Sequence, residues 1–520
     1  MGKDQALLRT ADGGYMWVPR DDPRFGEVRL LHEKEAVGDV QSPEKATTDN
    51  LLIVGDSYDA LQSLNRIPEY ASEYRGRIKL VYIDPPFNTG QAFQHYDDAL
   101  EHSVWLTMMR DRLLLIRDLL APDGSVWVHL DDAEMAYCRV LMDEIFGRSS
   151  FITSIIWQKA DSPRNSARHF SVDQDYIHVY AKDADIWRPN RLPRTEETDK
   201  SYRNPDNDPN GPWIAGDPFA NKPYSLGRYE VTGPTGNVFS PPPGRYWRVS
   251  KERFEELDRE GRIWWRGGGD ARPRIKRYLS EVADLVPRTV WDFKEVGSSG
   301  ESSREMRRLL PDVPVFSTPK PERLLHRILT IATKPGDIVL DCFAGSGTTA
   351  AVAHKMERRW ITVELSQETV ETFTRSRLSK VVNGDDPGGV TKTAEWSKGG
   401  GFRILEVSPS MYSLAEGHLF LAEWVTNGAF SKAVAAQLDF AFRDEPPFCG
   451  TKGRSRLAVI DGVVDEQIIR AVVAHLNDDE RAVVVGKGAT ADAGTLLKEL
   501  NSGSRLRKAP KDLLKRGVVR

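Results

Sequence analysis

The sequence has few cysteines, no long apolar run and no excess of charge of either sign. Three of its 520 residues are cysteines, and their wide spacing suits neither a disulfide framework nor a zinc cluster, so no metal site is expected. The first residues lack an apolar signal segment, and no apolar run is long enough to span a bilayer. These absences favour a soluble cytoplasmic protein with no membrane partner.

The overall composition is that of an ordinary globular protein. Hydrophobic residues make up 40% and charged residues 28%, and the length suggests roughly three domains. Lys and Arg number 72 against 76 Asp and Glu, which gives a net charge of −4. Any surface that binds nucleic acid must therefore be local rather than global.

A short apolar segment that ends in an acid and two prolines is the most informative stretch. Leu80–Ile83 predicts a strand buried on both faces of a parallel sheet. The strand must end at Asp84, because Pro85 and Pro86 cannot donate to a ladder. A carboxylate, a backbone carbonyl and the Phe87 ring are thus placed where open α/β sheets bind ligands. Together they can accept hydrogen bonds from an exocyclic amine and stack on the attached ring, although the four residues could also be only a turn.

A second buried strand leads into a glycine-rich turn. Ile338–Leu340 predicts the strand, and the glycine turn after Asp341 predicts a helix start whose N–H groups favour an anionic group. The next strand ends at Glu364, an acid suited to ribose hydroxyls. Gly345-Ser346-Gly347 could also begin a dinucleotide-binding pattern, but Ala350 replaces its third glycine. That alternative leaves the Asp84 turn unexplained.

Together the two stretches resemble motifs IV and I of amino-methylating DNA methyltransferases. The catalytic turn precedes the cofactor turn in the chain, which is the order of the family's β class. The segments Asp84–Gly90 and Gly399–Arg403 look more specifically like those of modification subunits from type III restriction systems. The resemblance covers roughly residues 50 to 410 and is specific because several spaced motifs agree.

The resemblance implies a methyl transfer from S-adenosylmethionine to the N6 amine of an adenine flipped out of a specific DNA duplex sequence. In this family Asp84 and the Pro85 carbonyl would accept hydrogen bonds from N6, Pro86 would complete the turn and Phe87 would stack on the base. Cytosine-N4 enzymes, which commonly have serine in place of Asp84, are the first alternative. A DNA-recognition subunit without turnover is the second.

The resemblance also implies a set of residues for the cofactor. Phe316–Lys320 resembles motif X, which lies beside the methionine end, and Asp341 would hold the ammonium group. The expected cofactor-binding residues are Asp56, Phe316, Lys320, Asp341, Phe343, Ala344, Gly345, Ser346, Gly347, Thr348, Thr349 and Glu364.

The expected fold is α/β, a doubly wound and mostly parallel Rossmann-like methyltransferase sheet. Leu51–Val54 can fill the slot of the third strand and place Asp56 near the cofactor's adenine, so the strand order is circularly permuted. The expected domains are an N-terminal arm (1–48), the catalytic half of the core (49–186), an inserted target-recognition domain (187–291), the cofactor half (292–400) and a small C-terminal α/β assembly domain (401–520).

The inserted segment has the composition of a DNA-binding surface. Prolines, glycines and tryptophans are frequent there, and basic residues are densest between Arg262 and Arg277. We expect Arg266 or Arg272 to contact a base edge and Lys276 and Arg277 to hold phosphate, although a solvated loop is the simpler alternative. The full expected set is Arg262, Arg266, Arg272, Arg274, Lys276 and Arg277.

The partners expected from these observations are double-stranded DNA, a second copy of the chain and a helicase–nuclease restriction subunit. The last two are what the resemblance implies. Residues 401–520 show no catalytic constellation of their own, which favours a role in assembly for that segment. The expected setting is a restriction–modification or other phage-defence system.

Overall fold

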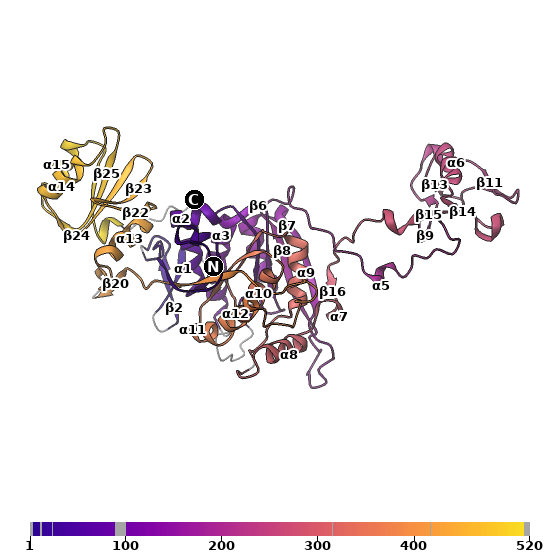
Figure 1. Cartoon of the computed structure of the whole chain (residues 1–520), viewed down its shortest axis with the longest axis horizontal. Coiled ribbons are helices and arrows are strands. Elements are labelled where there is room, and N and C mark those ends of the chain that lie inside the picture. The colour runs from indigo at the N-terminus through magenta and orange to yellow at the C-terminus, as the bar shows by residue number, and fades with distance from the viewer. Residues whose placement is uncertain are drawn as a thin grey trace. The chain divides into compact units, whose positions relative to one another are not determined.

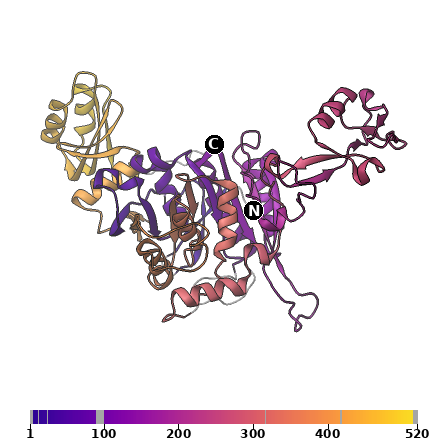
Figure 2. The ribbon, with the colours of Figure 1, turned by 45° about the vertical axis from the view of Figure 1, so that its right-hand side comes forward.

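The computed structural model describes residues 4–10, 13–22, 24–88, 100–314, 316–415 and 418–513. The chain forms two compact units (Figures 1 and 2). Unit 1 comprises residues 1–190 and 288–520, and unit 2 comprises residues 191–287. Within the described residues, no helix is both long and apolar enough to cross a membrane.

Unit 1 is built on a ten-stranded sheet in the order β16-β7-β8-β6-β5-β17-β18-β4-β19-β3. The strands are β16 (Val290–Trp291), β7 (Phe151–Gln158), β8 (Gln174–Ala181), β6 (Leu120–Leu130), β5 (Ile78–Ile83), β17 (Ile338–Asp341), β18 (Arg359–Glu364), β4 (Asn50–Val54), β19 (Gly401–Val407) and β3 (Leu31–Gly38). The six strands from β6 to β19 are parallel, whereas β8 and β3 run antiparallel to their neighbours.

Helices cover both faces of this sheet. The first layer contains α1 (Ser57–Arg66), α3 (His102–Leu119) and α4 (Met135–Phe146), and the second contains α9 (Glu322–Ala332), α10 (Thr348–Lys355) and α12 (Arg375–Asn383). The crossovers through α1 and α10 run in opposite directions along the sheet, so right-handed connections place them on opposite faces. The third strand, β4, precedes the first, β17, in the chain. The expected doubly wound, circularly permuted α/β fold is confirmed.

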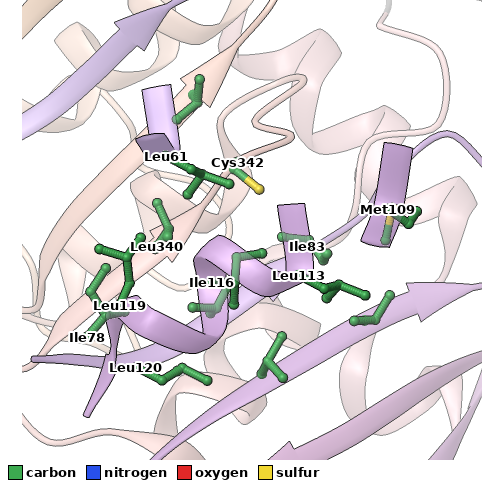
Figure 3. Packing of buried hydrophobic residues seen from close by; sticks show 14 of the residues in the cluster. Leu61, Ile78, Ile83, Met109, Leu113, Ile116, Leu119, Leu120, Leu340 and Cys342 are labelled. Atoms are coloured by element: carbon green, nitrogen blue, oxygen red, sulfur yellow. The ribbon is translucent and has the colours of Figure 1, made fainter. Parts of the chain in front are cut away.

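The main core lies between the sheet and the first helix layer. In Figure 3, side chains from α3 such as Met109, Leu113 and Ile116 meet Ile83 and Leu340 from the two central strands. All five are at most 1% exposed. At roughly 25 cal/mol per Å² of buried apolar surface, this packing fixes β5 and β17 side by side, and with them the two motifs at their ends.

Two domain boundaries differ from those expected. β19 belongs to the central sheet rather than to the C-terminal domain, and β3, from the expected N-terminal arm, pairs with it as the edge strand. Both strands carry charged residues, so their sequences lack the continuous apolar run that is typical of a buried strand. In the structure Arg403 of β19 is neutralised by Asp49 at 2.7 Å and by Glu33 at 2.8 Å. Charged side chains are also typical of an edge strand, which they protect from further pairing.

Shorter elements complete the N-terminal part of unit 1 and the link back to the sheet. A hairpin of β1 (Gln5–Arg9) and β2 (Tyr15–Pro19) precedes β3, and α2 (Pro68–Tyr74) follows α1. α7 (Phe293–Val296) and α8 (Ser299–Leu309) precede α9, and α11 (Gln367–Thr369) precedes α12.

The C-terminal part of unit 1 has its own five-stranded sheet in the order β22-β23-β24-β25-β26. Its strands are β22 (Ala441–Glu445), β23 (Phe448–Lys452), β24 (Ser455–Val464), β25 (Arg481–Ala489) and β26 (Arg505–Lys508), with helices α13 (Asn427–Gln437), α14 (Glu466–Ala474) and α15 (Ala493–Leu500). A small hairpin of β20 (Tyr412–Ala415) and β21 (His418–Leu421) leads into it. Val28 and Ile67 share its apolar core, so this part packs on the N-terminal region.

Unit 2 is a small, mainly β structure inserted between β8 and β16. Its strands are β9 (Trp213–Gly216), β10 (Phe219–Ala220), β11 (Val231–Thr232), β12 (Val238–Phe239), β13 (Tyr246–Trp247), β14 (Ile263–Trp264) and β15 (Arg274–Tyr278), with helices α5 (Glu196–Asp199) and α6 (Lys251–Arg259). Its core is aromatic: Trp247 is fully buried and packs edge-on against Phe254 at 5.2 Å between ring centroids. Such a core gives a unit of this size a fixed shape.

Candidate active site

The carboxyl ends of β5, β17, β18 and β4 surround one cavity of about 410 Å³. This volume lies within the range of small-molecule sites, about 300–1,000 Å³. Asp84 and Pro86 line it, together with the expected cofactor-binding residues except Gly347. Pro85 and Phe87 do not line it. The sheet therefore brings the two sequence motifs to one place, as their positions at neighbouring strand ends require.

Asp84 is held by only one of its two carboxylate oxygens. Its Oδ2 accepts a hydrogen bond from Lys320 Nζ at 2.5 Å, and this ammonium also lies 5.0 Å from the centre of the Phe87 ring. Its Oδ1 is buried and has no hydrogen-bond partner among the described residues. Leaving a buried acceptor without a hydrogen bond costs about 1–3 kcal/mol of folding free energy. A ligand that donates a hydrogen bond to Oδ1 would recover this cost.

Phe87 stands on a chain of buried polar groups. Its ring stacks on His129, with 5.9 Å between the centroids and 29° between the planes. His129 Nδ1 lies 2.8 Å from the Tyr82 hydroxyl, and its Nε2 lies 3.2 Å from Asp175 Oδ2. Asp175 Oδ1 in turn accepts from Lys159 Nζ at 2.6 Å. The chain fixes the His129 ring and therefore the surface on which Phe87 rests.

The hydrogen bonds of Asp175 explain its charge state. Burial alone would raise the pKa of Asp175, but the His129 hydrogen bond and the nearby Lys159 and Lys320 lower it to about 2. Burial lowers the pKa of His129, which favours the neutral ring. The ring that lies beneath Phe87 is therefore the neutral form of the His129 imidazole.

Asp341, at the end of β17, is buried, and no residue in the described part of the chain forms an ion pair with it. Its oxygens accept from the Phe343 N–H at 3.0 Å and from the Thr349 hydroxyl at 2.6 Å. Burial and the neighbouring charges of Asp84 and Glu364 raise the pKa of Asp341 to about 7. A cationic ligand would relieve this accumulation of negative charge.

The glycine turn is fixed from both sides. Glu364 accepts the Gly345 N–H at 2.8 Å and the Ser366 N–H at 3.0 Å, and burial raises its pKa. Gly345 and Gly347 have φ of 50° and 75°, a region that favours glycine. A Cβ on Gly345 would also lie only 3.2 Å from the Phe316 ring. The backbone can therefore approach a ligand closely at this turn.

Asp56 lines the same cavity but has a structural partner already. It caps α1 by accepting the Tyr58 N–H at 2.7 Å, and it accepts from the buried Arg112 at 2.7 Å. Arg112 also donates to the Ser57 hydroxyl at 2.6 Å. Sequence reasoning missed Arg112, because an arginine inside an amphipathic helix is usually solvent-exposed.

The expected DNA-binding residues of unit 2 divide into two groups. Arg266, Arg272 and Arg277 are exposed, with no ion pair among the described residues. Arg262 is paired with Glu281, and Arg274 lies 3.8 Å from Asp217.

Lys276 requires a correction, because it does not lie on the surface. Its side chain is 7% exposed and its ammonium lies 2.5 Å from Asp208 and 2.6 Å from Asp206. The hydrogen bonds to Lys276 help lower the pKa of Asp208 against the effect of burial. β15 turns Lys276 and Tyr278 inward, where both contact Asp208, and leaves Arg277 outside. An ammonium enclosed by two carboxylates is not available to a phosphate.

The polar chain beneath Phe87 is the other feature that sequence reasoning did not find. His129, Asp175 and Lys159 belong to no motif in the sequence. A similar partnership nearby joins Asn88 and His102, which contact Glu134 Oε1 at 2.8 Å and 2.9 Å. The only signal was the position of His129 in the strand next to β5, which is too weak to choose a partner.

Comparison with known proteins gives a consistent result. A family described as "DNA methylase" matches residues 78–375. The chain is 29% identical over 441 residues to a probable type III restriction-modification enzyme HindVI Mod subunit from Haemophilus influenzae, covering 72% of this chain and 56% of that protein. It is 31% identical over 339 residues to the StyLTI Mod subunit from Salmonella typhimurium, covering 59% and 50%.

A third relative is shorter than the Mod subunits. Type II methyltransferase M.EcaI from Enterobacter cloacae is 32% identical over 320 residues, covering 59% of this chain and 67% of that protein. The aligned part of this chain spans about half the length of the two Mod subunits. The family match contains both β5 with its Asp84 turn and β17 with its glycine turn. This chain therefore belongs to the DNA methylase family.

Proposed function

We propose that this protein transfers a methyl group from S-adenosylmethionine to the N6 amine of an adenine in duplex DNA. The observation that carries the proposal is the shared cavity: Asp84, one oxygen of which has no hydrogen-bond partner among the described residues, lines the same cavity as the glycine turn and Asp341. An amine acceptor and a site for a cationic amino-acid ligand are thus close enough for direct transfer.

The cavity fits the cofactor in its charges and its shape. The cofactor supplies an activated methyl group when bound. Asp341 would hold its ammonium, because the raised pKa of this carboxyl, about 7, reflects a negative charge without a counter-ion. Gly345 leaves room for the methionine moiety beside Phe316, and the N–H groups at the start of α10 would face its carboxylate. Glu364 would accept from the ribose hydroxyls.

The Asp84 turn would hold the target base. An adenine inside a duplex is out of reach, so it must leave the base stack, which costs a few kcal/mol. Phe87, supported by His129, would stack on the extruded base. Asp84 Oδ1 would accept an N–H of the amine and direct its nitrogen lone pair toward the methyl group, while Lys320 holds Oδ2 in place. Hydrogen bonds that strengthen as the nitrogen gains positive charge accelerate the step.

Unit 2 would choose the DNA sequence. Arg266, Arg272 and Arg277 are exposed basic residues of unit 2. A guanidinium can bind a guanine edge through two hydrogen bonds or hold a phosphate. The two Mod relatives are named as parts of type III restriction-modification enzymes. By analogy we extend the proposal to a homodimer that docks a helicase–nuclease subunit, which co-purification from expressing cells would test.

The test of the activity is transfer of tritium from methyl-labelled S-adenosylmethionine to mixed-sequence duplex DNA. Methylation-sensitive long-read sequencing of DNA from expressing cells would then identify the target site. Label in DNA, confined to one sequence, is the expected result. Failure of the folded, cofactor-binding protein to label any DNA would contradict the proposal and favour a recognition subunit.

A further inference from the structure

The loop between β7 and β8 (residues 159–173) leaves the sheet at the same edge as the Asp84 turn. β6 is parallel to β5, β8 is antiparallel to β6, and β7 is antiparallel to β8. β7 therefore runs in the direction of β5, and the loop that follows it rises from the carboxyl edge. In Figures 1 and 2 the loop extends away from the body of unit 1 as a purple hairpin.

The tip of this loop carries an apolar ring that has no place in the core. Residues 161–170 are all exposed, and Phe170 is 89% exposed, more than any other large apolar side chain among the described residues. Arg164, Arg168 and His169 stand beside it. An aromatic ring left in water has no stabilising role in the folded chain, and with basic neighbours it suits a partner that is both stacked and anionic.

Backbone hydrogen bonds fix the base of the loop to the rest of unit 1. The Lys159 N–H donates to the Asp173 carbonyl at 2.8 Å, and the Ser299 N–H donates to the Lys159 carbonyl at 2.9 Å. Higher up, the Arg164 N–H donates to the Ser171 hydroxyl at 2.9 Å and closes the loop across its width. Residues 165–170 form the free end beyond this bond.

The same base is tied to the ring that would hold the target adenine. Lys159, at the start of the loop, pairs with Asp175 at 2.6 Å, just after its end. Asp175 contacts His129, on which Phe87 stacks. Ala167 lies eight positions after Lys159, so the tip can extend at most about 27 Å, several times the minor-groove depth of about 7.5 Å.

We propose that this loop is a wedge: Phe170 enters the base stack beside the target adenine, and Arg164 and Arg168 hold the flanking phosphates. Extrusion of a base leaves a gap in the stack, and an inserted apolar side chain occupies it and opposes the return of the base. This inference rests on the proposed methyl transfer to duplex DNA. It adds a second contact surface, on unit 1, that is separate from sequence choice by unit 2.

The test compares Phe170→Ala on two duplexes that contain the mapped target site. One duplex is fully paired, and the other has a mismatch opposite the target adenine, which lowers the cost of extrusion. The methylation rate should fall about 10- to 100-fold on the paired duplex and less than 3-fold on the mismatched one. Phe170→Trp, which keeps the ring, should retain most of the activity on both.

The matched control is Val140→Ala, which removes an apolar side chain that is 68% exposed on α4. It should leave both rates unchanged. Equal rates of Phe170→Ala and the parent on the paired duplex would overturn the wedge, as would equal losses on the two duplexes. If the parent labels no DNA at all, the proposed function itself fails, which is a distinguishable outcome.

Discussion

Two groups of carboxylates near the glycine turn differ in how well their charges are matched. The first, the cavity group, consists of Asp84, Asp341 and Glu364. The second, the Glu322 cluster, consists of Glu322, Lys355, Arg377 and Asp386. Glu322 accepts from Lys355 at 2.8 Å and 3.0 Å, from Arg377 at 2.8 Å and from the Val390 N–H at 2.9 Å.

This difference in partners produces opposite shifts in pKa. Burial would raise the pKa of Glu322, but Arg377 and Lys355 lower it below its usual range. In the cavity group, Lys320 pairs with Asp84, but burial raises the pKa of Asp341 and of Glu364, and no described residue forms an ion pair with either of these two. A saturated cluster stabilises the fold, whereas an unsaturated one marks a place where a ligand completes the charge balance.

The two groups are also connected. Arg377 donates to the Thr348 hydroxyl at 2.7 Å, and Thr348 is the first residue of α10, directly after the glycine turn. The saturated cluster therefore holds the frame on which the unsaturated one depends.

The largest effect should come from Glu322→Gln. Removing this charge leaves two buried cations partly unpaired, and breaking a buried pair in this way costs about 3–5 kcal/mol. Urea denaturation followed by fluorescence should show a loss of unfolding free energy of that size. The control is Glu301→Gln, which breaks a partly exposed pair with Arg323 and should cost less than about 1 kcal/mol. An equal loss of unfolding free energy in the two variants would contradict the structural role of the Glu322 cluster.

Asp341→Asn should weaken cofactor binding without weakening the fold. The variant loses a charge with which no described residue forms an ion pair, so the melting temperature should not fall. Affinity for S-adenosylmethionine, measured by calorimetry, should fall about 10- to 100-fold, or about 1.4–2.7 kcal/mol. A lower melting temperature with unchanged affinity would place Asp341 among the structural carboxylates instead.

The raised pKa of Asp341 also predicts a pH dependence of cofactor binding. Because its pKa is about 7 in the folded protein and near 4 when unfolded, ionisation of Asp341 reduces stability as pH rises between these values. A bound ammonium reverses this effect, so affinity should rise about tenfold from pH 6 to pH 8. Calorimetry at pH 6 in two buffers should detect proton release, and its absence would contradict this assignment.

The smallest effect concerns the basic residues of unit 2. Here too, a cation without an ion-pair partner is available to a ligand, whereas a paired cation is not. Arg266→Ala removes an exposed arginine and should reduce the salt dependence of DNA binding by about one phosphate contact. Lys276→Met removes an ammonium that Asp206 and Asp208 already satisfy, so the salt dependence should stay the same. Filter binding at several salt concentrations separates them, and a reduced slope for Lys276→Met would reverse the assignment.

The sequence predicted the cavity group well because each member has a local signal. Asp84 and Asp341 come directly after short apolar runs and before proline or glycine, which ends a strand and exposes its last side chain. The parallel order then brings those ends together. The same strand signals predicted the permuted sheet, because Leu51–Val54 fills the slot of the third strand, as β4 does in the structure.

The Glu322 cluster could not be predicted in this way. Its members lie on α9, α10 and α12 and in the loop after α12, and no pattern links them. The prediction that Lys276 holds a phosphate was wrong for a related reason, because a charged residue in a strand is expected to face water. Asp206 and Asp208, which are distant in the sequence, neutralise the Lys276 ammonium and allow it to be buried. Charge pairing is a property of the folded chain, whereas strand ends are a property of the local sequence.

The most direct test of the account is the identity of the methylated nucleoside. Duplex DNA would be incubated with trideuteromethyl-labelled S-adenosylmethionine and either the parent, Asp84→Ala or Asp132→Ala, digested and analysed by mass spectrometry. Asp132 is an exposed acid just beyond the neighbouring strand β6 and serves as the control. The label should appear on N6 of adenine with the parent and Asp132→Ala, and fall at least a thousandfold, about 4 kcal/mol, with Asp84→Ala. Label on cytosine N4, or undiminished label with Asp84→Ala, would contradict the central claim.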